Sequence, residues 1–286
     1  MRPFLKWAGG KHRSAKRISR HLPPGDRLIE PFVGAGAIFL STDYPSYLLA
    51  DTNNDLIQLF RILKEHGTDF IESCSELFGG KNNTESRYYL LRNEFNRSAD
   101  PWWRSCCFVY LNRHGYNGLC RYNSDGKFNI PFGRYKNPIF PSAEMEFFAV
   151  KAQQAEFVCA DFRATLGRAK IGDVVYCDPP FTPLSATANF TKYAPGGFSD
   201  QDHMDIVDMV VRLRKNGITS VISNHLTPLT ERIYTGADRI EYFDAPRSIS
   251  CQGGNRTKVA EVLAIFEGSQ TANNCNSRLS STATVL

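Results

Sequence analysis

The stretch DRLIEPFVGAGAIFL, residues 26–40, joins an apolar run to a pair of closely spaced glycines. The apolar run predicts a buried strand, and Gly34 and Gly36 predict a tight turn after it. The residues that follow predict the start of a helix. A strand that passes through a turn into a helix is the repeating step of an open α/β sheet.

The same alternation returns further along the chain. Residues 55–67 have helical spacing, with Gly67 expected to end the helix, and Ser199 with Asp202 resembles a capping box for a helix that Gly217 closes. Another helix is expected at residues 142–153, and further strands at residues 47–53, 156–161, 174–177, 218–225, 238–244 and 257–266, the last two as a closing hairpin. The pattern predicts an open, mostly parallel sheet with ligands at the carboxyl ends of its strands.

One long segment interrupts this alternation. Residues 69–112 are expected to be mainly helical, and residues 113–140 are irregular, with a hairpin signal at residues 124–126. An inserted domain would produce this interruption, and residues 182–198 form a polar loop long enough to act as a lid. We therefore expect a discontinuous α/β domain at residues 1–54 with 142–267, an inserted domain at residues 55–141 and a flexible tail at residues 268–286.

Composition narrows the class of protein. The 286 residues are 42% hydrophobic and 22% charged, which is ordinary for a soluble globular protein. There is no apolar run near the roughly 18 residues that a membrane helix needs, and no secretory leader. The eight cysteines contain no C-x-x-C pair and the six histidines do not cluster. We expect a cytoplasmic protein with reduced, buried thiols, no bound metal and no membrane partner.

The net charge of +5 is unevenly distributed. Residues 1–27 contain eight Lys or Arg against one acid, and residues 87–136 contain nine against three. The remainder of the chain is therefore acidic. Two concentrated basic regions on an otherwise acidic chain suggest a polyanionic partner, although solvated basic faces would give the same pattern.

The glycine turn suggests a nucleoside-containing cofactor. Gly34 and Gly36 allow close approach of backbone to ligand, and Asp51, at the end of the next expected strand, could accept hydrogen bonds from ribose hydroxyls. A nicotinamide dinucleotide fingerprint needs a third glycine where this chain has Phe39. S-adenosylmethionine, which has a ribose and an adenine but no pyrophosphate, fits better. A merely structural turn is the alternative.

The stretch GDVVYCDPPF, residues 172–181, ends another expected strand in an acid, two prolines and an aromatic ring. Taken alone, Asp178-Pro179-Pro180 can be a simple turn. An exocyclic amino group on a base is a poor nucleophile, and a carboxylate with a nearby backbone carbonyl would activate it by accepting its N–H bonds. The ring of Phe181 could stack on a base swung out of a duplex.

Three motifs in this order, FLKWAGGK (4–11), EPFVGAG (30–36) and DPPF (178–181), resemble the alpha group of DNA N6-adenine methyltransferases. Residues 110–136, 183–193 and 222–225 are similar to the Dam-type enzymes of that group, which modify adenine in GATC. The likeness covers residues 4–266. It implies a Rossmann-like, S-adenosylmethionine-dependent methyltransferase sheet with an inserted, mainly helical DNA-recognition domain.

The resemblance also implies residue roles. The cofactor, whose product is S-adenosylhomocysteine, would be surrounded by Trp7, Lys11, Phe32, Gly34, Gly36, Asp51, Asp161, Phe162 and Asp178. The flipped adenine would be held by Asp178, Pro179, Pro180 and Phe181. Double-stranded DNA would be bound by Lys6 at the first guanine, Arg121 at an outer guanine, Leu119 and Pro131 at thymine, Tyr116 as a wedge supported by Asn117, and Asn129, Arg134, Tyr135 and Lys136 around them.

We therefore expect a monomeric adenine-N6 methyltransferase that flips its target base in GATC and transfers the methyl group directly. One departure is Phe181, where Dam-type enzymes carry tyrosine; stacking needs only the ring face. The alternatives are the same chemistry on another short site, as in restriction–modification, or on RNA, and a non-catalytic DNA-binding relative. A nicotinamide oxidoreductase is disfavoured by Phe39.

Overall fold

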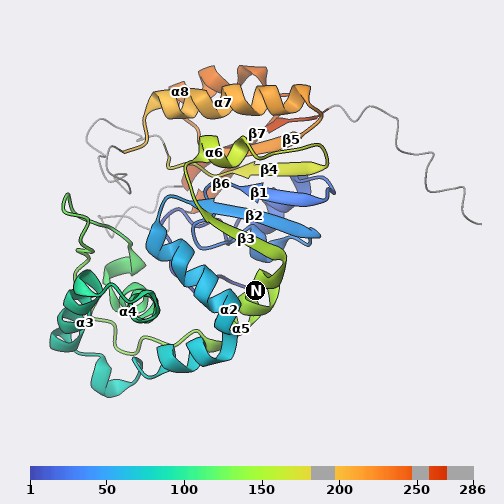
Figure 1. Ribbon diagram of the computed structural model, residues 1–286. Helices are drawn as coiled ribbons and strands as arrows, with labels where there is room; N and C mark the ends of the chain where they lie inside the picture. The colour runs from blue at the N-terminus through green and yellow to red at the C-terminus, as the bar shows by residue number, and fades with distance from the viewer. Residues whose placement is uncertain (182–196, 247–257, 269–286) are drawn as a thin grey trace, which may run out of the picture.

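The computed structural model describes residues 1–181, 197–246 and 258–268, and within them seven strands form one sheet (Figure 1). In the sheet order β3-β2-β1-β4-β5-β7-β6, β1 to β5 run parallel, whereas β7 is antiparallel to both its neighbours. The strands are β1 (Arg27–Glu30), β2 (Ser46–Asp51), β3 (Ala155–Cys159), β4 (Asp173–Cys177), β5 (Thr219–His225), β6 (Arg239–Pro246) and β7 (Lys258–Phe266). The predicted α/β fold with a mostly parallel sheet is confirmed. Strand order reverses between β1 and β4, which is where such sheets bind ligands.

Three helices, α6 (Phe162–Leu166), α7 (Asp200–Lys215) and α8 (Pro228–Ile233), cover one face of the sheet, at the top of Figure 1. Strand residues such as Ile29 and Val175 pack there against Ile206 and Val210 of α7. The predicted capping box begins α7: the N–H of Asp202 donates to the Ser199 hydroxyl, and the Ser199 N–H donates to the Asp202 carboxylate. The helix ends before Gly217, whose φ is 79°.

The opposite face is covered by α1 (Ala15–Ile18), α5 (Ser142–Lys151) and the first half of α2 (Asn54–Ser75). Phe148 of α5 lies at the centre of an aromatic cluster, with ring centroids 4.6 Å from Phe60, 5.9 Å from Phe157 and 5.2 Å from Phe4. Burying each ring contributes about 1.5–3 kcal/mol. Because Phe4 is only 1% exposed, this cluster holds the N-terminal segment in place just before the motif residues 6–11.

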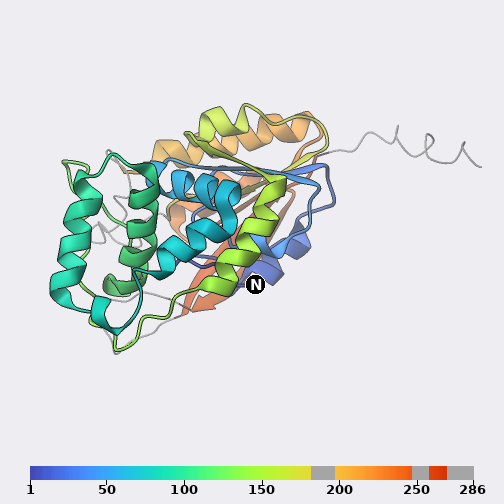
Figure 2. The ribbon, with the colours of Figure 1, turned by 60° about the horizontal axis from the view of Figure 1, so that its bottom comes forward.

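The remaining helices, α3 (Glu85–Arg97) and α4 (Pro101–His114), pack with the second half of α2 beside the sheet (Figure 2). Asp100 caps α4 by accepting the Trp102 N–H at 3.0 Å, and Pro101 occupies the first helical position, where its missing N–H costs nothing. The buried residues of this helical part belong to the same cluster as those under the sheet. The division into two domains stays a prediction, and α2 crosses the boundary proposed for it.

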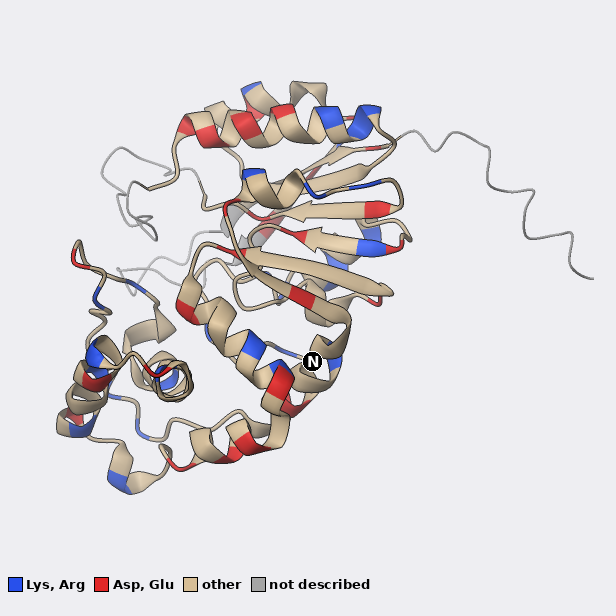
Figure 3. Ribbon diagram, viewed as in Figure 1, with Lys and Arg blue, Asp and Glu red and all other residues tan. Residues whose placement is uncertain are grey.

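Residues 115–137, which we call the recognition segment, leave α4 with little regular structure. The predicted hairpin is present: Tyr122 and Phe128 form an antiparallel bridge, and the turn between them contains Gly126 with a φ of 70°. Side chains of α3 hold it, since Asn96 exchanges hydrogen bonds with the Phe128 backbone (2.8 and 3.1 Å) and the Tyr88 hydroxyl donates to the Ile130 carbonyl. Figure 3 shows Lys and Arg along this segment and on α3.

One local expectation was confirmed and one was wrong. Gly67 interrupts the regular helix as expected, with a φ of 41°, and a second helical stretch runs on to Ser75, where Phe70, Ile71 and Cys74 bury a further apolar face. After Gly36 the chain forms only a 3₁₀ turn, η2 (Phe39–Ser41), instead of a helix start. β2 begins only five residues after η2.

Several other expectations concern composition and flanking segments. The lid proposed at residues 182–198 lies mostly outside the described residues. The tail proposed at residues 268–286 lies almost entirely outside them. Of the cysteines described, Cys159 is exposed and the others are buried. Within the described residues there is no helix long and apolar enough to span a membrane, and no group of three or more His, Cys, Asp or Glu side chains that could hold a metal ion.

Candidate active site

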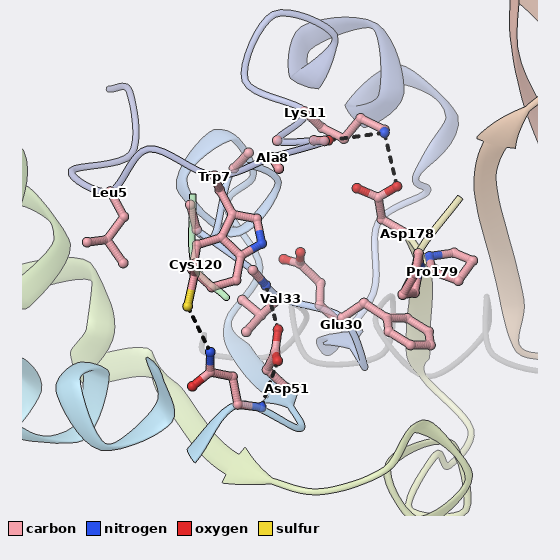
Figure 4. A pocket seen from close by; sticks show the side chains of 18 of the residues that line it. Leu5, Trp7, Ala8, Lys11, Glu30, Val33, Asp51, Cys120, Asp178 and Pro179 are labelled. Carbon is pink, nitrogen blue, oxygen red and sulfur yellow. Dashed lines mark hydrogen bonds and ion pairs between the residues drawn. The ribbon is translucent and has the colours of Figure 1, made fainter. Parts of the chain in front are cut away.

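A cavity of about 760 Å³, the strand-end pocket, lies where β1, β2 and β4 end beneath the N-terminal segment (Figure 4). Most of the predicted cofactor and target residues line it. These are Trp7, Lys11, Phe32, Gly34, Asp51, Asp161, Phe162, Asp178, Pro179, Pro180 and Phe181. Gly36 is the exception: it is buried behind the lining with a φ of 74°, so it shapes the turn without facing the cavity.

One end of the pocket is built from the glycine turn and Asp51. The Asp51 carboxylate accepts the Gly34 N–H at 3.2 Å and the Asn53 N–H at 2.9 Å, so the end of β2 and the turn after β1 are joined. A Cβ on Gly34 would come within 2.8 Å of the Trp7 indole nitrogen, so only glycine fits. Burial raises the pKa of Asp51, and the backbone donors oppose that shift.

The other end is built around Asp178. Its Oδ1 accepts a hydrogen bond from the Ser223 hydroxyl at 2.8 Å and lies 3.1 Å from the Lys11 ammonium. Lys11 also lies 3.8 Å from Glu261 and 3.9 Å from the centroid of the Phe181 ring. Burial raises the pKa of Asp178, while Lys11 and Ser223 act against that rise. Both contacts use Oδ1. Among the described residues none is seen to donate to Oδ2, so this oxygen is the one that a ligand could use.

Sequence reasoning missed four residues that line the pocket or contact the side chains lining it. Glu30 ends β1 and is 2% exposed; burial and the nearby Asp178 carboxylate raise its pKa to about 8. Figure 4 shows its carboxyl group between Trp7 and Asp178. Ser223 and Glu261 come from β5 and β7, and His225 packs its ring 3.9 Å from that of Phe181. Glu30 could have been found, because it follows a buried strand just as Asp51 and Asp178 do; the others carry no local signal.

Four of the predicted DNA-contacting residues are connected through Tyr135, although they come from the N-terminal segment and from both ends of the recognition segment. The Lys6 ammonium lies 4.0 Å from the centroid of the Tyr135 ring, and the Tyr135 hydroxyl accepts the Asn117 N–H at 2.9 Å. Asn117 has a positive φ of 54°, and the side chain of its neighbour Tyr116 is 48% exposed. Tyr135 therefore connects Lys6, on the N-terminal segment, to the exposed ring expected to wedge into DNA.

The other predicted contacts follow along the segment. Arg121 is exposed and donates to the Asn129 side chain at 2.8 Å, so the two are brought together on the hairpin. Leu119 is half-buried, and Pro131, whose carbonyl accepts the Tyr116 N–H, is exposed. Arg134 and Lys136 are exposed; Arg134 lies 3.6 Å from Glu85. Apart from Lys6, the residues predicted to contact DNA do not line the pocket.

The sheet order, with acidic strand ends around one pocket where the order reverses, defines a Rossmann-like α/β fold. Residues 7–249 match the family model described as D12 class N6 adenine-specific DNA methyltransferase. The chain belongs to this family, which makes it a DNA methyltransferase acting on adenine.

Curated relatives cover nearly the whole chain. It is 50% identical to a DNA adenine methylase of Vibrio cholerae over 93% of its length and 96% of that protein. It is also 50% identical to the DNA adenine methylase of Salmonella typhi and 49% identical to that of Escherichia coli K12, each across 93% of this chain and 95% of the relative. The match to one solved structure is more distant: a putative methyltransferase complexed with SAH has 11% identity and a TM-score of 0.39, covering 90% of this chain and 52% of that one.

Proposed function

We propose that this enzyme transfers a methyl group from S-adenosylmethionine to N6 of an adenine flipped out of GATC in duplex DNA. The observation that carries the proposal is one pocket with two differently equipped ends. One end offers a glycine turn and an acid beside an indole ring; the other offers an acid, a proline carbonyl and a half-buried aromatic ring. A nucleoside-containing methyl donor and a flipped base are two ligands that such ends would accommodate together.

The cofactor end suits S-adenosylmethionine. The backbone at Gly34 lies so close to the Trp7 indole that a side chain at position 34 would not fit between them. The turn and the indole together form an apolar wall of the pocket. Phe32 and Phe162 pack together at 5.6 Å and complete an aromatic lining, where an adenine ring would find apolar contacts. Asp51 would accept hydrogen bonds from ribose hydroxyls. When bound, the cofactor supplies an electrophilic methyl group on its sulfonium.

The target end suits an adenine amino group. In our proposal Oδ2 of Asp178 and the carbonyl of Pro179 accept the two N6–H bonds, which concentrates electron density on the nitrogen. Lys11 and Ser223 hold Oδ1 and keep the carboxylate from turning away. The nitrogen gains the methyl group and loses one proton, which Asp178 can accept before releasing it to water. Phe181, supported by His225, would stack on the base.

Recognition of GATC is proposed from the recognition segment and from similarity to DNA adenine methylases. Arg121 is exposed beside Asn129, and arginine paired with guanine is the commonest specific contact in the major groove. Tyr116 offers an exposed ring next to Asn117, whose N–H donates to the Tyr135 hydroxyl; a residue that replaces a flipped base in the stack needs such an exposed ring.

The test is to incubate the protein with S-adenosylmethionine and plasmid DNA, then digest the product with two endonucleases. One cuts GATC only when the adenine is methylated, and the other only when it is not. We expect a complete switch in sensitivity. Methyl incorporation without the switch would overturn the GATC assignment but keep the chemistry. No incorporation at all would overturn the proposed mechanism.

A further inference from the structure

The turn that joins β2 to α2, residues 51–55, carries polar side chains that reach two separate parts of the molecule. Asp51 faces the strand-end pocket. Asn53 caps α2 by accepting the Leu56 N–H at 3.1 Å, and its amide donates to the Cys120 sulfur at 3.4 Å. Figure 4 shows this contact, with Cys120 and Asp51 at the same end of the pocket.

Asp55 makes the stronger connection. Its Oδ2 accepts the Tyr122 hydroxyl at 2.7 Å, and its Oδ1 accepts two N–H bonds from Arg104, at 2.7 and 3.1 Å. The Asp55 side chain is only 14% exposed. Arg104 is fixed in turn, because it donates to the Phe95 carbonyl at 2.6 Å and lies over the Phe95 ring. The Tyr122 hydroxyl therefore bonds to a carboxylate that is held rigidly on its other oxygen.

Arg121 lies between these two anchored residues. Cys120 and Tyr122 face inward to Asn53 and Asp55, and the residue between them faces outward, as alternation along an extended segment requires. The opposite side of the hairpin is fixed as well: the Asn129 N–H donates to the Arg121 carbonyl at 3.1 Å. The direction of the Arg121 side chain thus depends on how its two neighbours are held.

We infer that Asp55 is a positioning residue for sequence discrimination: through Tyr122 it fixes the hairpin that presents Arg121 to DNA. The inference rests on the proposed function, in which Arg121 reads an outer guanine. Two parallel hydrogen bonds to one base edge require the guanidinium to be held in place and in plane. A hairpin released at Tyr122 presents the same arginine with more freedom, which weakens the correct pairing relative to the incorrect one.

The test uses Tyr122→Phe, which removes the hydroxyl and keeps the ring that packs against Phe128. The readout is the ratio of kcat/KM on a GATC duplex to kcat/KM on a duplex with one outer G·C pair changed. We expect this ratio to fall by about fivefold to tenfold. Tyr110→Phe is the matched control, because its buried hydroxyl donates to the Asn82 carbonyl away from the hairpin. It should leave the ratio unchanged.

Arg121→Ala separates this inference from the proposed function. In an Arg121→Ala background, Tyr122→Phe should have no further effect on the ratio, because the hairpin anchor acts through Arg121. Suppose that Arg121→Ala abolishes discrimination, whereas Tyr122→Phe leaves the ratio unchanged, even if it lowers kcat/KM on both duplexes equally. The positioning role is then wrong and the proposed function stands. If Arg121→Ala itself leaves the ratio unchanged, the assigned role of Arg121 fails and the inference fails with it.

Discussion

The strand-end pocket and the recognition segment hold their functional side chains in opposite ways. In the pocket, Asp51 and Asp178 are largely buried, and each receives contacts from two or more neighbours. In the recognition segment, Tyr116 and Arg121 are exposed, and it is the backbone beneath them that is fixed. Chemistry on a base needs groups oriented before the substrate arrives. Reading a base edge needs donors that are left open to it.

The largest effect should follow from Asp178→Asn. The amide cannot take up the proton that N6 loses, and it has only one oxygen, so the rate of methyl transfer in a single turnover should fall about a thousandfold. Asp208→Asn, at an exposed carboxylate of α7, should leave the rate unchanged. Residual transfer within tenfold of the parent rate would show that the buried carboxylate is not the activating group.

Glu30→Gln tests the cost of burying an acid in the same pocket. Because the pKa of Glu30 is raised from 4.5 to about 8, the folded protein keeps a proton that the unfolded chain releases as pH rises between these values. Stability therefore falls as pH rises through that window. The variant lacks this loss, so its free energy of unfolding relative to the parent should rise by about 4 kcal/mol between pH 5 and pH 8.5. Denaturant unfolding at the two values measures it; a pH-independent difference would refute the assignment.

Arg121→Ala should change specificity more than turnover. Losing one arginine–guanine pairing is expected to reduce discrimination against a changed outer base pair by about tenfold to a hundredfold, measured as the ratio of kcat/KM values. Arg134→Ala is the comparison, because Arg134 is exposed on the same segment. It should weaken binding to all duplexes alike and reduce the salt dependence of binding. If Arg121→Ala and Arg134→Ala change discrimination and salt dependence equally, Arg121 does not read a base and Arg134 does not act only on the DNA backbone.

Phe181→Tyr should have the smallest effect. The ring that contacts Lys11 and His225 is retained, so kcat/KM should change by less than about threefold. Phe181→Ala removes the stacking surface and should cost about tenfold or more. A large loss in the tyrosine variant would mean that this site depends on an apolar ring edge and that stacking alone is an insufficient account.

The same contrast explains what the sequence could predict. Asp51 and Asp178 were predictable because each follows a short apolar run, and the ends of neighbouring parallel strands meet at one edge. Ser223 and Glu261 were not, since they come from strands 45 and 83 positions beyond Asp178, and only the packing of the sheet brings them to it. The interruption of α2 at Gly67 was predictable, because a glycine within an apolar helical pattern signals a change of backbone direction.

The recognition segment was predictable mainly through family resemblance. Its composition indicated an irregular, basic loop, and its hairpin turn was visible at residues 124–126. The contacts that fix it come from far along the chain: Tyr122 bonds to Asp55, 67 positions away, and Tyr135 contacts Lys6. Spacing patterns report periodic elements, and a loop held by such pairings has no period.

The most direct test of this division of labour is to map methylated adenines at base resolution on one plasmid after treatment with the parent enzyme, Asp178→Asn and Arg121→Ala. We predict N6-methyladenine confined to GATC for the parent, almost none for Asp178→Asn, and methylation spread to related sites for Arg121→Ala. Methylation by Asp178→Asn at the parental level, or an unchanged set of sites for Arg121→Ala, would contradict the account.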